Sequence, residues 1–154
     1  KRIDHIAIGK DISSSVSKRE QDAFLAKIAA AVRPFGHIVL TDLMLVKEEF
    51  RKDRAVTSWL KRDVADAAPD VVGAYAPIFK ELGFDVRIEE DETDAYRGFV
   101  LESWAAFVDG LQKEDLDREL VSRMIVEAEY WVYLMRALQA NKVRLYRLHA
   151  IKKA

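Results

Sequence analysis

The chain has 154 residues, half of them hydrophobic and a third charged, a composition typical of a single soluble domain with its own core. Its 25 basic and 26 acidic side chains give a formal net charge of −1, which argues against a nucleic-acid partner. The lack of cysteine excludes disulfides and cysteine-based metal sites. No apolar run is long enough to cross a membrane and no signal peptide is recognisable, so we expect a cytoplasmic protein with no membrane partner.

The first part of the chain predicts a strand, a helix and a second strand. Isoleucine-rich Ile3–Ile8 is a short strand candidate, and the polar, turn-like segment KDISSSVS follows it. Ser17 and Glu20 fit a capping box at the start of a helix, which Pro34 should stop. The next strand, His37–Asp42, has a continuous apolar centre, as expected of a strand that is covered on both faces.

The second part predicts further helices and two more strands. The expected helices are Lys47–Ala67, Asp70–Leu82, Leu101–Leu111 and Leu116–Asn141. Pro77 should kink or restart the second of these helices. Phe84–Glu89 alternates apolar and charged residues, which indicates a strand with one wet face near a sheet edge. Val143–Ile151 is the last strand, and helices between strands favour a largely parallel α/β sheet.

Several stretches resemble the C-terminal half of a class I S-adenosylmethionine-dependent methyltransferase. AFLAKIAAAVRPFGHIVLTDLML is similar to the helix, turn and fifth strand of that family, and FKELGFDVRIEEDETDAY to its sixth strand with the flanking segments. VRLYRLHAIKKA resembles the terminal seventh strand. KDISSSV stands where phosphoethanolamine-type N-methyltransferases carry an RDxxxHI phrase. Together these stretches cover essentially the whole chain, in the right order.

The resemblance implies an α/β fold, half of a Rossmann-like methyltransferase sheet with flanking helices. Residues 1–154 form one domain that begins at the family's fourth strand and lacks its N-terminal cofactor-binding strands. The expected spatial order is 4-5-7-6 by family count, so Val143–Ile151 is antiparallel and lies between His37–Asp42 and Phe84–Glu89. The family's glycine-rich cofactor turn belongs to the missing part, and all six glycines of this chain are isolated.

The resemblance also implies where ligands would lie. Gly9 and Lys10 follow the first strand, at a tip that borders the cofactor in the family. Asp11 and Ser15 fall in the segment that borders the substrate. The alternative for Gly9, Lys10 and Asp11 is simply a turn. Ser15 stands where related N-methyltransferases place a histidine, and a serine cannot act as a base near pH 7 without help, so no catalytic residue is assigned.

Two more residues are candidate substrate ligands. Asp42 should close its strand at the carboxyl end, which lines the ligand crevice of open α/β sheets, and its carboxylate would suit a cationic amine. The alternative is a helix cap or a loop carboxylate. Tyr96 would reach the mouth of the site in the branch that its segment resembles, or else anchor the next helix as a surface aromatic. EEDETD, Glu89–Asp94, is interpreted as a solvated loop, and no metal site is expected.

Histidines and tryptophans are given structural interpretations. His5, His37 and His149 fall on strands that the fold would make neighbours, and we expect them to be satisfied separately rather than to bind a metal. Trp104 and Trp131 occur at helical spacing, which favours core packing over an aromatic cage.

The functional hypothesis is methyl transfer from S-adenosylmethionine to a small polar acceptor by a parent enzyme. The isolated chain should be inactive and bind S-adenosylmethionine weakly or not at all, because the methionine and ribose contacts normally come from the missing half. The alternative is a non-catalytic methyltransferase-like module for assembly or partner binding. In either case we expect a homo-oligomer formed through the Ile3–Ile8 edge, or pairing with a missing N-terminal half.

Overall fold

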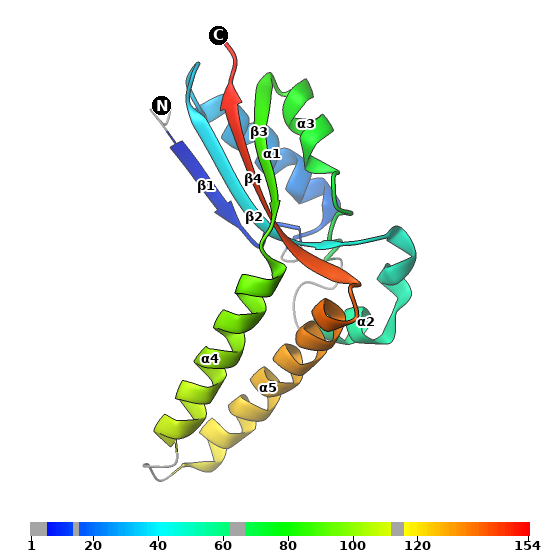
Figure 1. The fold of residues 1–154 in the computed structure, drawn as a ribbon, viewed down its shortest axis with the longest axis vertical. Helices are drawn as coiled ribbons and strands as arrows, with labels where there is room; N and C mark the ends of the chain where they lie inside the picture. Colours follow the sequence, from blue (N-terminus) through cyan, green and yellow to red (C-terminus); the bar gives the residue numbers. More distant parts are fainter. Residues whose placement is uncertain (1–5, 14–15, 62–66, 112–115) are drawn as a thin grey trace.

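Four strands form one mixed sheet in the order β1-β2-β4-β3 (Figure 1). The computed structural model describes residues 6–13, 16–61, 67–111 and 116–154. The strands are β1 (Ile6–Lys10), β2 (His37–Leu45), β3 (Phe84–Asp91) and β4 (Val143–Lys152). β1 runs parallel to β2, while β4 is antiparallel to both β2 and β3. The predicted sheet order and the central, antiparallel place of the last strand are therefore confirmed.

Two strand boundaries differ from the prediction. β2 does not end at Asp42 but continues to Leu45, which pairs with Val143 of β4. β1 continues through Gly9 to Lys10, because Gly9 pairs with Leu40 of β2. Residues 3–5 of the predicted strand lie outside the described residues. β3 is an edge strand, as predicted, but its burial does not alternate, because the five residues from Arg87 to Asp91 are all exposed.

Local sequence signals explain the first helix, α1 (Lys18–Ala31). The Glu20 carboxylate accepts a hydrogen bond from the Ser17 backbone N–H at 3.1 Å, and the Ser17 hydroxyl accepts one from the Glu20 N–H at 3.5 Å. This reciprocal pair is the predicted capping box. The helix ends before Pro34, as expected.

The two middle helices are shorter than predicted. The 3-10 helix η1 (Glu48–Lys52) is followed by α2 (Arg54–Leu60), with Asp53 capping α2 through a 2.8 Å bond from Ala55 N–H. Residues 62–66 lie outside the described residues.

The helix predicted from Asp70 is α3 (Tyr75–Glu81), so the prediction is wrong for residues 70–74. Those residues instead bond to the end of β2. The Leu45 N–H donates to the Asp70 carbonyl, and the Val72 N–H donates to the Leu45 carbonyl, both at 2.8 Å. Pro77 lies in the first turn of α3, where its missing N–H leaves no helix bond unmade.

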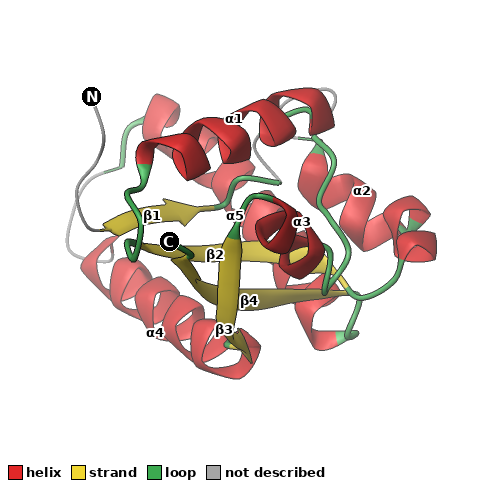
Figure 2. Ribbon diagram, turned by 90° about the horizontal axis from the view of Figure 1, so that it is seen from above, coloured by secondary structure: helices red, strands yellow, loops and turns green. Residues whose placement is uncertain are grey.

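Helices α1 and α3 lie on one side of the sheet (Figure 2). Their buried side chains and those of the strands form the main core, which includes Leu25, Val32, Ile38, Leu40, Phe79, Phe84 and Ala150. A second core joins α2 and the sheet to the end of α5, and contains Leu43, Leu45, Val56, Trp59, Leu134, Ala137, Leu138, Val143 and Leu145. The two clusters pack against opposite faces of the sheet.

The remaining helices are α4 (Thr93–Leu111) and α5 (Arg118–Gln139). They lie side by side and extend away from the sheet, beyond the carboxyl end of β3 (Figure 1). We call this pair the helical hairpin. None of the described helices combines the length and the hydropathy needed to span a bilayer.

His37 and His149 contact each other on the sheet face opposite α1. The His37 Nδ1 and His149 Nε2 atoms are 2.9 Å apart, with the ring planes within 7° of each other. The expectation that these histidines are satisfied separately is therefore wrong. Their strands are neighbours, with His37 opposite Ile151 and His149 opposite Val39, so the two rings are diagonal neighbours. His5 lies outside the described residues.

Candidate functional site

Lys10, Asp11 and Tyr96, three of the predicted ligand residues, lie at the carboxyl edge of the sheet. β1, β2 and β3 are parallel to one another, and the helical hairpin begins where β3 ends (Figure 1). In open α/β sheets this edge lines the ligand crevice. The segment after β1, the end of β2 and the first turn of α4 together form the candidate site.

Gly9 lies tightly against two core side chains at this edge. A Cβ atom at this position would lie 2.5 Å from Leu40 Cδ2 and 2.9 Å from Ile12 Cδ1. Both leucine and isoleucine belong to the main core. The structure thus supplies a steric reason for glycine here, independent of any cofactor.

Lys10 and Asp11 line a cavity of about 480 Å³ between the end of β1 and α1. The Lys10 ammonium lies 3.8 Å from the Asp11 carboxylate, and both side chains are exposed. Asp11 adopts a left-handed backbone conformation with φ of 52°, and its N–H donates to the Thr41 carbonyl at 3.0 Å. This bond fixes the turn, so that the chain leaves the sheet with Asp11 at the mouth of the cavity.

Tyr96 lies in the first turns of α4, within electrostatic reach of Asp11. Burial raises the pKa of the Tyr96 hydroxyl, and the nearby Asp11 and Tyr130 raise it further. Tyr130 comes from α5, so three separate elements converge here. A phenol with a raised pKa keeps its proton at neutral pH, and Tyr96 is therefore a hydrogen-bond donor rather than a base.

Asp42 is buried, with 1% of its surface exposed. Its carboxylate accepts hydrogen bonds from the Ser13 N–H at 2.8 Å, the Leu43 N–H at 2.9 Å and the Tyr75 hydroxyl at 2.5 Å. Burial raises the pKa of Asp42, although the bonds from Tyr75 and Ser13 oppose that rise. The premise of the substrate-ligand prediction, an open strand end at Asp42, is wrong. Asp42 instead ties the turn after β1 to α3.

A polar network continues from Asp42 to the surface. The Gln21 amide donates to the Tyr75 hydroxyl at 2.9 Å and to the Asp70 carboxylate at 2.6 Å. The Lys18 ammonium then donates to Asp70 at 2.9 Å. Asp42, Tyr75, Gln21 and Asp70 thus form a connected chain of side chains that links β2, α3 and α1. Such a network holds the carboxyl edge in one arrangement.

Sequence reasoning missed Ser13, Gln21, Tyr75 and Tyr130. Each has an ordinary place in a polar turn or along a helix, and no motif marks it. Ser15 lies outside the described residues, so its predicted role stays a prediction.

The acidic run from Glu89 is largely exposed, but it lies at the end of β3 and the start of α4 and several of its carboxylates are paired with arginines. β3 runs to Asp91 and α4 begins at Thr93, so the expected loop is wrong. Arg147 contacts Glu90 at 2.7 Å and Glu92 at 2.8 Å, and Arg144 pairs with Asp91. Within the described part of the chain, no group of three histidine or acidic side chains is arranged to hold a metal ion.

Solved structures with similar folds are methyl-transferring enzymes and their relatives. The chain is similar to phosphoethanolamine N-methyltransferase 2 of Haemonchus contortus in complex with S-adenosyl-L-methionine, with a TM-score of 0.74 at 14% identity, over 97% of this chain and 33% of that one. A protein from Galdieria sulphuraria assigned as a sarcosine dimethylglycine methyltransferase gives 0.73 at 14% identity, over 96% and 52%. A cyclopropane synthase of Mycobacterium tuberculosis gives 0.68 at 12% identity, over 96% and 55%.

These likenesses confirm the fold that the sequence resemblance implies. The chain has the architecture of part of a class I S-adenosylmethionine-dependent methyltransferase domain. It spans between a third and just over half of the length of these proteins. No protein-family profile and no curated protein sequence matches it.

Proposed function

We propose that this chain is the C-terminal portion of an S-adenosylmethionine-dependent methyltransferase that acts on a small polar acceptor. The observation that carries the proposal is the methyltransferase-like sheet, whose carboxyl edge carries Asp11 after β1 and Tyr96 at the start of α4, within electrostatic reach of each other. In the proposed enzyme the cofactor supplies a methyl group bound to a sulfonium sulfur. The described residues then have to bind and align the acceptor, which is the main demand of an in-line transfer.

Each residue of the site has a proposed role. The Asp11 carboxylate binds a polar or cationic group of the acceptor, at the mouth of its cavity. The Tyr96 hydroxyl donates a hydrogen bond to the acceptor. Asp42 fixes the turn that carries Asp11, through the Ser13 N–H. Ser15 completes the acceptor side of this segment.

The described residues fit only one wall of a cofactor site. Lys10 lines the cavity beside β1 and is proposed to face the cofactor. The position that a Cβ atom of residue 9 would occupy faces Leu40 and Ile12. The Gly9 backbone is therefore not open to a ligand on that side. Because the chain has no glycine-rich turn, we propose that it binds S-adenosylmethionine weakly or not at all by itself. The same observation favours the second candidate, a non-catalytic module for assembly or partner binding.

Calorimetric titration with S-adenosylmethionine separates these proposals. The parent protein that carries the N-terminal strands should bind it, and this chain alone should bind it at least about 10-fold more weakly, a difference of roughly 1.4 kcal/mol. A parent that does not bind S-adenosylmethionine would leave the non-catalytic module as the better proposal. Low-micromolar binding by this chain alone would contradict the one-wall site.

Turnover of the parent protein with a panel of small amines and hydroxyl compounds tests the acceptor site. Asp11→Asn should lower kcat/KM by about 10- to 100-fold, the loss expected for a hydrogen bond to a charged group. Asp94→Asn is the control, because the Asp94 side chain is an almost fully exposed carboxylate at the start of α4 and has no proposed contact with a ligand. Equal activity of the two variants would exclude Asp11 from the acceptor site.

A further inference from the structure

Exposed apolar side chains are concentrated on the helical hairpin, which extends away from the sheet (Figure 1). Most of the large hydrophobic residues that are exposed in the described part of the chain belong to its two helices. Those on α4 are Phe99, Leu101, Phe107 and Val108, and those on α5 are Leu120, Val121, Ile125, Val126 and Val132. Monomeric proteins rarely expose so much apolar surface in one region, and such patches mark interaction sites.

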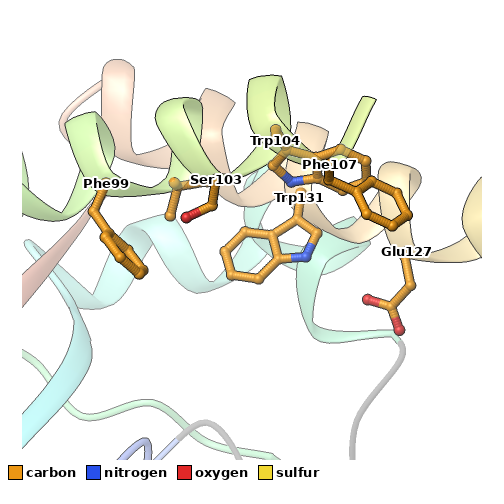
Figure 3. A pocket seen from close by; sticks show the side chains of 7 residues that line it. Phe99, Ser103, Trp104, Phe107, Glu127 and Trp131 are labelled. Atoms are coloured by element: carbon orange, nitrogen blue, oxygen red, sulfur yellow. The ribbon is translucent and has the colours of Figure 1, made fainter. Parts of the chain in front are cut away.

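One face of the hairpin carries an aromatic groove of about 300 Å³ (Figure 3). Trp104 of α4 and Trp131 of α5 line it, and Trp104 contacts Phe107 edge to face with ring centroids 5.6 Å apart. Trp131 packs partly against the second core, as its spacing predicts. Trp104 belongs to neither core cluster, so the core packing expected for it is not found. Its ring instead packs against a neighbour on its own helix.

The opposite face of the hairpin is apolar as well. Residues two apart point to nearly opposite sides of a helix. On α4, Leu101 is two residues from both Phe99 and Ser103, which line the groove. On α5, Ile125 is two residues from Glu127, which also lines it. Leu101 and Ile125 are 58% and 62% exposed, and both therefore point away from the groove.

Apolar residues on this face follow the spacing of a helix contact. They are Leu101, Ala105 and Val108 of α4, and Val121, Ile125, Ala128 and Val132 of α5, which we call the hairpin seam. On both helices they follow one another in steps of four and three residues. This is the spacing of the apolar contacts in coiled coils and four-helix bundles. All but the half-buried Ala128 are exposed, so the described chain leaves this contact unfilled.

The composition of the two helices favours a protein partner. Neither α4 nor α5 contains a lysine, and each contains a tryptophan. A lack of lysine together with aromatic residues is typical of surfaces that bind other proteins. The two helices together carry six acidic and four basic side chains. This balance disfavours an anionic membrane surface or a nucleic acid, both of which select basic residues.

We propose that the hairpin seam is the contact surface of a homodimer, in which the hairpins of two copies of this chain pack into a four-helix bundle. The helices have 19 and 22 residues, so the hairpin face is about 30 Å long and about 20 Å wide. Covering it in both copies buries roughly 1,200 Å² in total, the lower limit of stable interfaces. A second hairpin matches this face in length, in width and in the spacing of its apolar residues. The contact does not depend on the proposed methyl transfer.

Sedimentation of the chain over a range of concentrations tests the homodimer. The measurements use an Ile8→Lys background, so that association through the β1 edge does not contribute. The mass should rise from monomer to dimer with concentration and should not exceed the dimer. Ile125→Glu should weaken the dimer by about 10-fold or more, because it places a charge in an apolar contact. Leu101→Glu should do the same from α4.

Two control variants establish which face is used. Val126→Glu should leave the dimer unchanged, because Val126 is an exposed neighbour of Ile125 that points about 100° away from the seam. Phe99→Glu should also leave it unchanged, because Phe99 lies on the groove face. Circular dichroism verifies that each variant is helical. A monomeric mass at high concentration would overturn the proposal. So would equal dimer affinities of the Ile125→Glu and Val126→Glu variants, or a dimer that only Phe99→Glu disrupts.

Discussion

Tyr75 donates its hydroxyl to the buried carboxylate of Asp42 across 2.5 Å, joining α3 to the centre of the sheet. The two residues are 33 positions apart in the chain. Because Asp42 also accepts from the Ser13 N–H, this contact holds the turn that presents Asp11. The geometry of the candidate site therefore depends on a buried side chain that does not line the cavity beside Asp11.

Tyr75→Phe should lower the free energy of unfolding by about 1–3 kcal/mol, because a buried carboxylate loses a donor and gains no water in its place. Urea denaturation followed by circular dichroism measures the change. Tyr133→Phe is the control, since Tyr133 is half-buried on α5 and remote from Asp42. Equal stability of the two variants would mean that the Tyr75 bond contributes nothing net.

The stability of the protein should depend on pH through Asp42. Burial raises the pKa of this carboxyl in the folded state, above its unfolded value of about 4. The folded state then binds the proton more tightly than the unfolded state. The contribution of Asp42 is fully present below about pH 4 and is lost as pH rises through the folded pKa.

Asp42→Asn tests this sign, because the amide does not titrate. The free energy of unfolding of the wild type minus that of the variant should decrease as pH rises above about 4. Urea denaturation of both proteins across the pH range gives this difference, in which other titrating groups cancel. A difference that is constant with pH, or that increases, would contradict a raised pKa.

Gly9→Ala should lower the free energy of unfolding by about 1–3 kcal/mol through overpacking. The added methyl group would meet Leu40 at 2.5 Å, and Leu40 is itself buried. Gly98→Ala is the control, and it should change the free energy of unfolding in the opposite direction. Nothing lies within 4 Å of its Cβ position on α4, so alanine should stabilise that helix by about 0.5–1 kcal/mol. Thermal unfolding of both variants tests the pair, and a neutral Gly9→Ala would show that Leu40 can move aside.

The sheet could be predicted because its information is local and periodic. Alternation in Phe84–Glu89 indicates an edge strand, and the order of strands and helices, with the family resemblance, fixes the topology. The end of β2 could not be predicted in this way. Asp42 looks like the polar residue that closes a strand, but Ser13 and Tyr75 satisfy it inside the sheet. Because both partners are far from Asp42 in the sequence, the residues next to Asp42 do not indicate these hydrogen bonds.

Only part of the candidate site could be predicted from the sequence. Asp11 and Tyr96 come together because strand ends and helix starts share one edge, which the fold class already implies. The contact of His37 with His149 depends on the register of β2 against β4, which hydrophobic pattern alone does not specify. The approach of Tyr130 to Tyr96 could not be predicted either, because it depends on how the two helices of the hairpin pack against each other.

The last prediction concerns assembly through β1, which has β2 as its neighbour in the described sheet and forms one of its edges. Ile8 of this strand is 74% exposed and Ile6 is 50% exposed. An edge strand with apolar side chains is a template for pairing with another chain. We therefore expect the chain to self-associate through β1 when no N-terminal methyltransferase half covers it. The buried area should reach the size of a specific interface, roughly 1,200 Å² or more in total.

Light scattering of the purified chain over a range of concentrations measures this association. Ile8→Lys should shift the mass toward the monomer, because a lysine on an edge strand opposes pairing, and its exposure leaves the fold intact. Ile88→Lys is the matched control, as Ile88 is also an exposed isoleucine but lies on the opposite edge strand, β3. Hydrogen exchange establishes whether β1 is formed in each sample. If the chain has a monomeric mass at high concentration while β1 is still protected, the edge is covered within the chain. If both variants lose association equally, the interface lies elsewhere on the sheet.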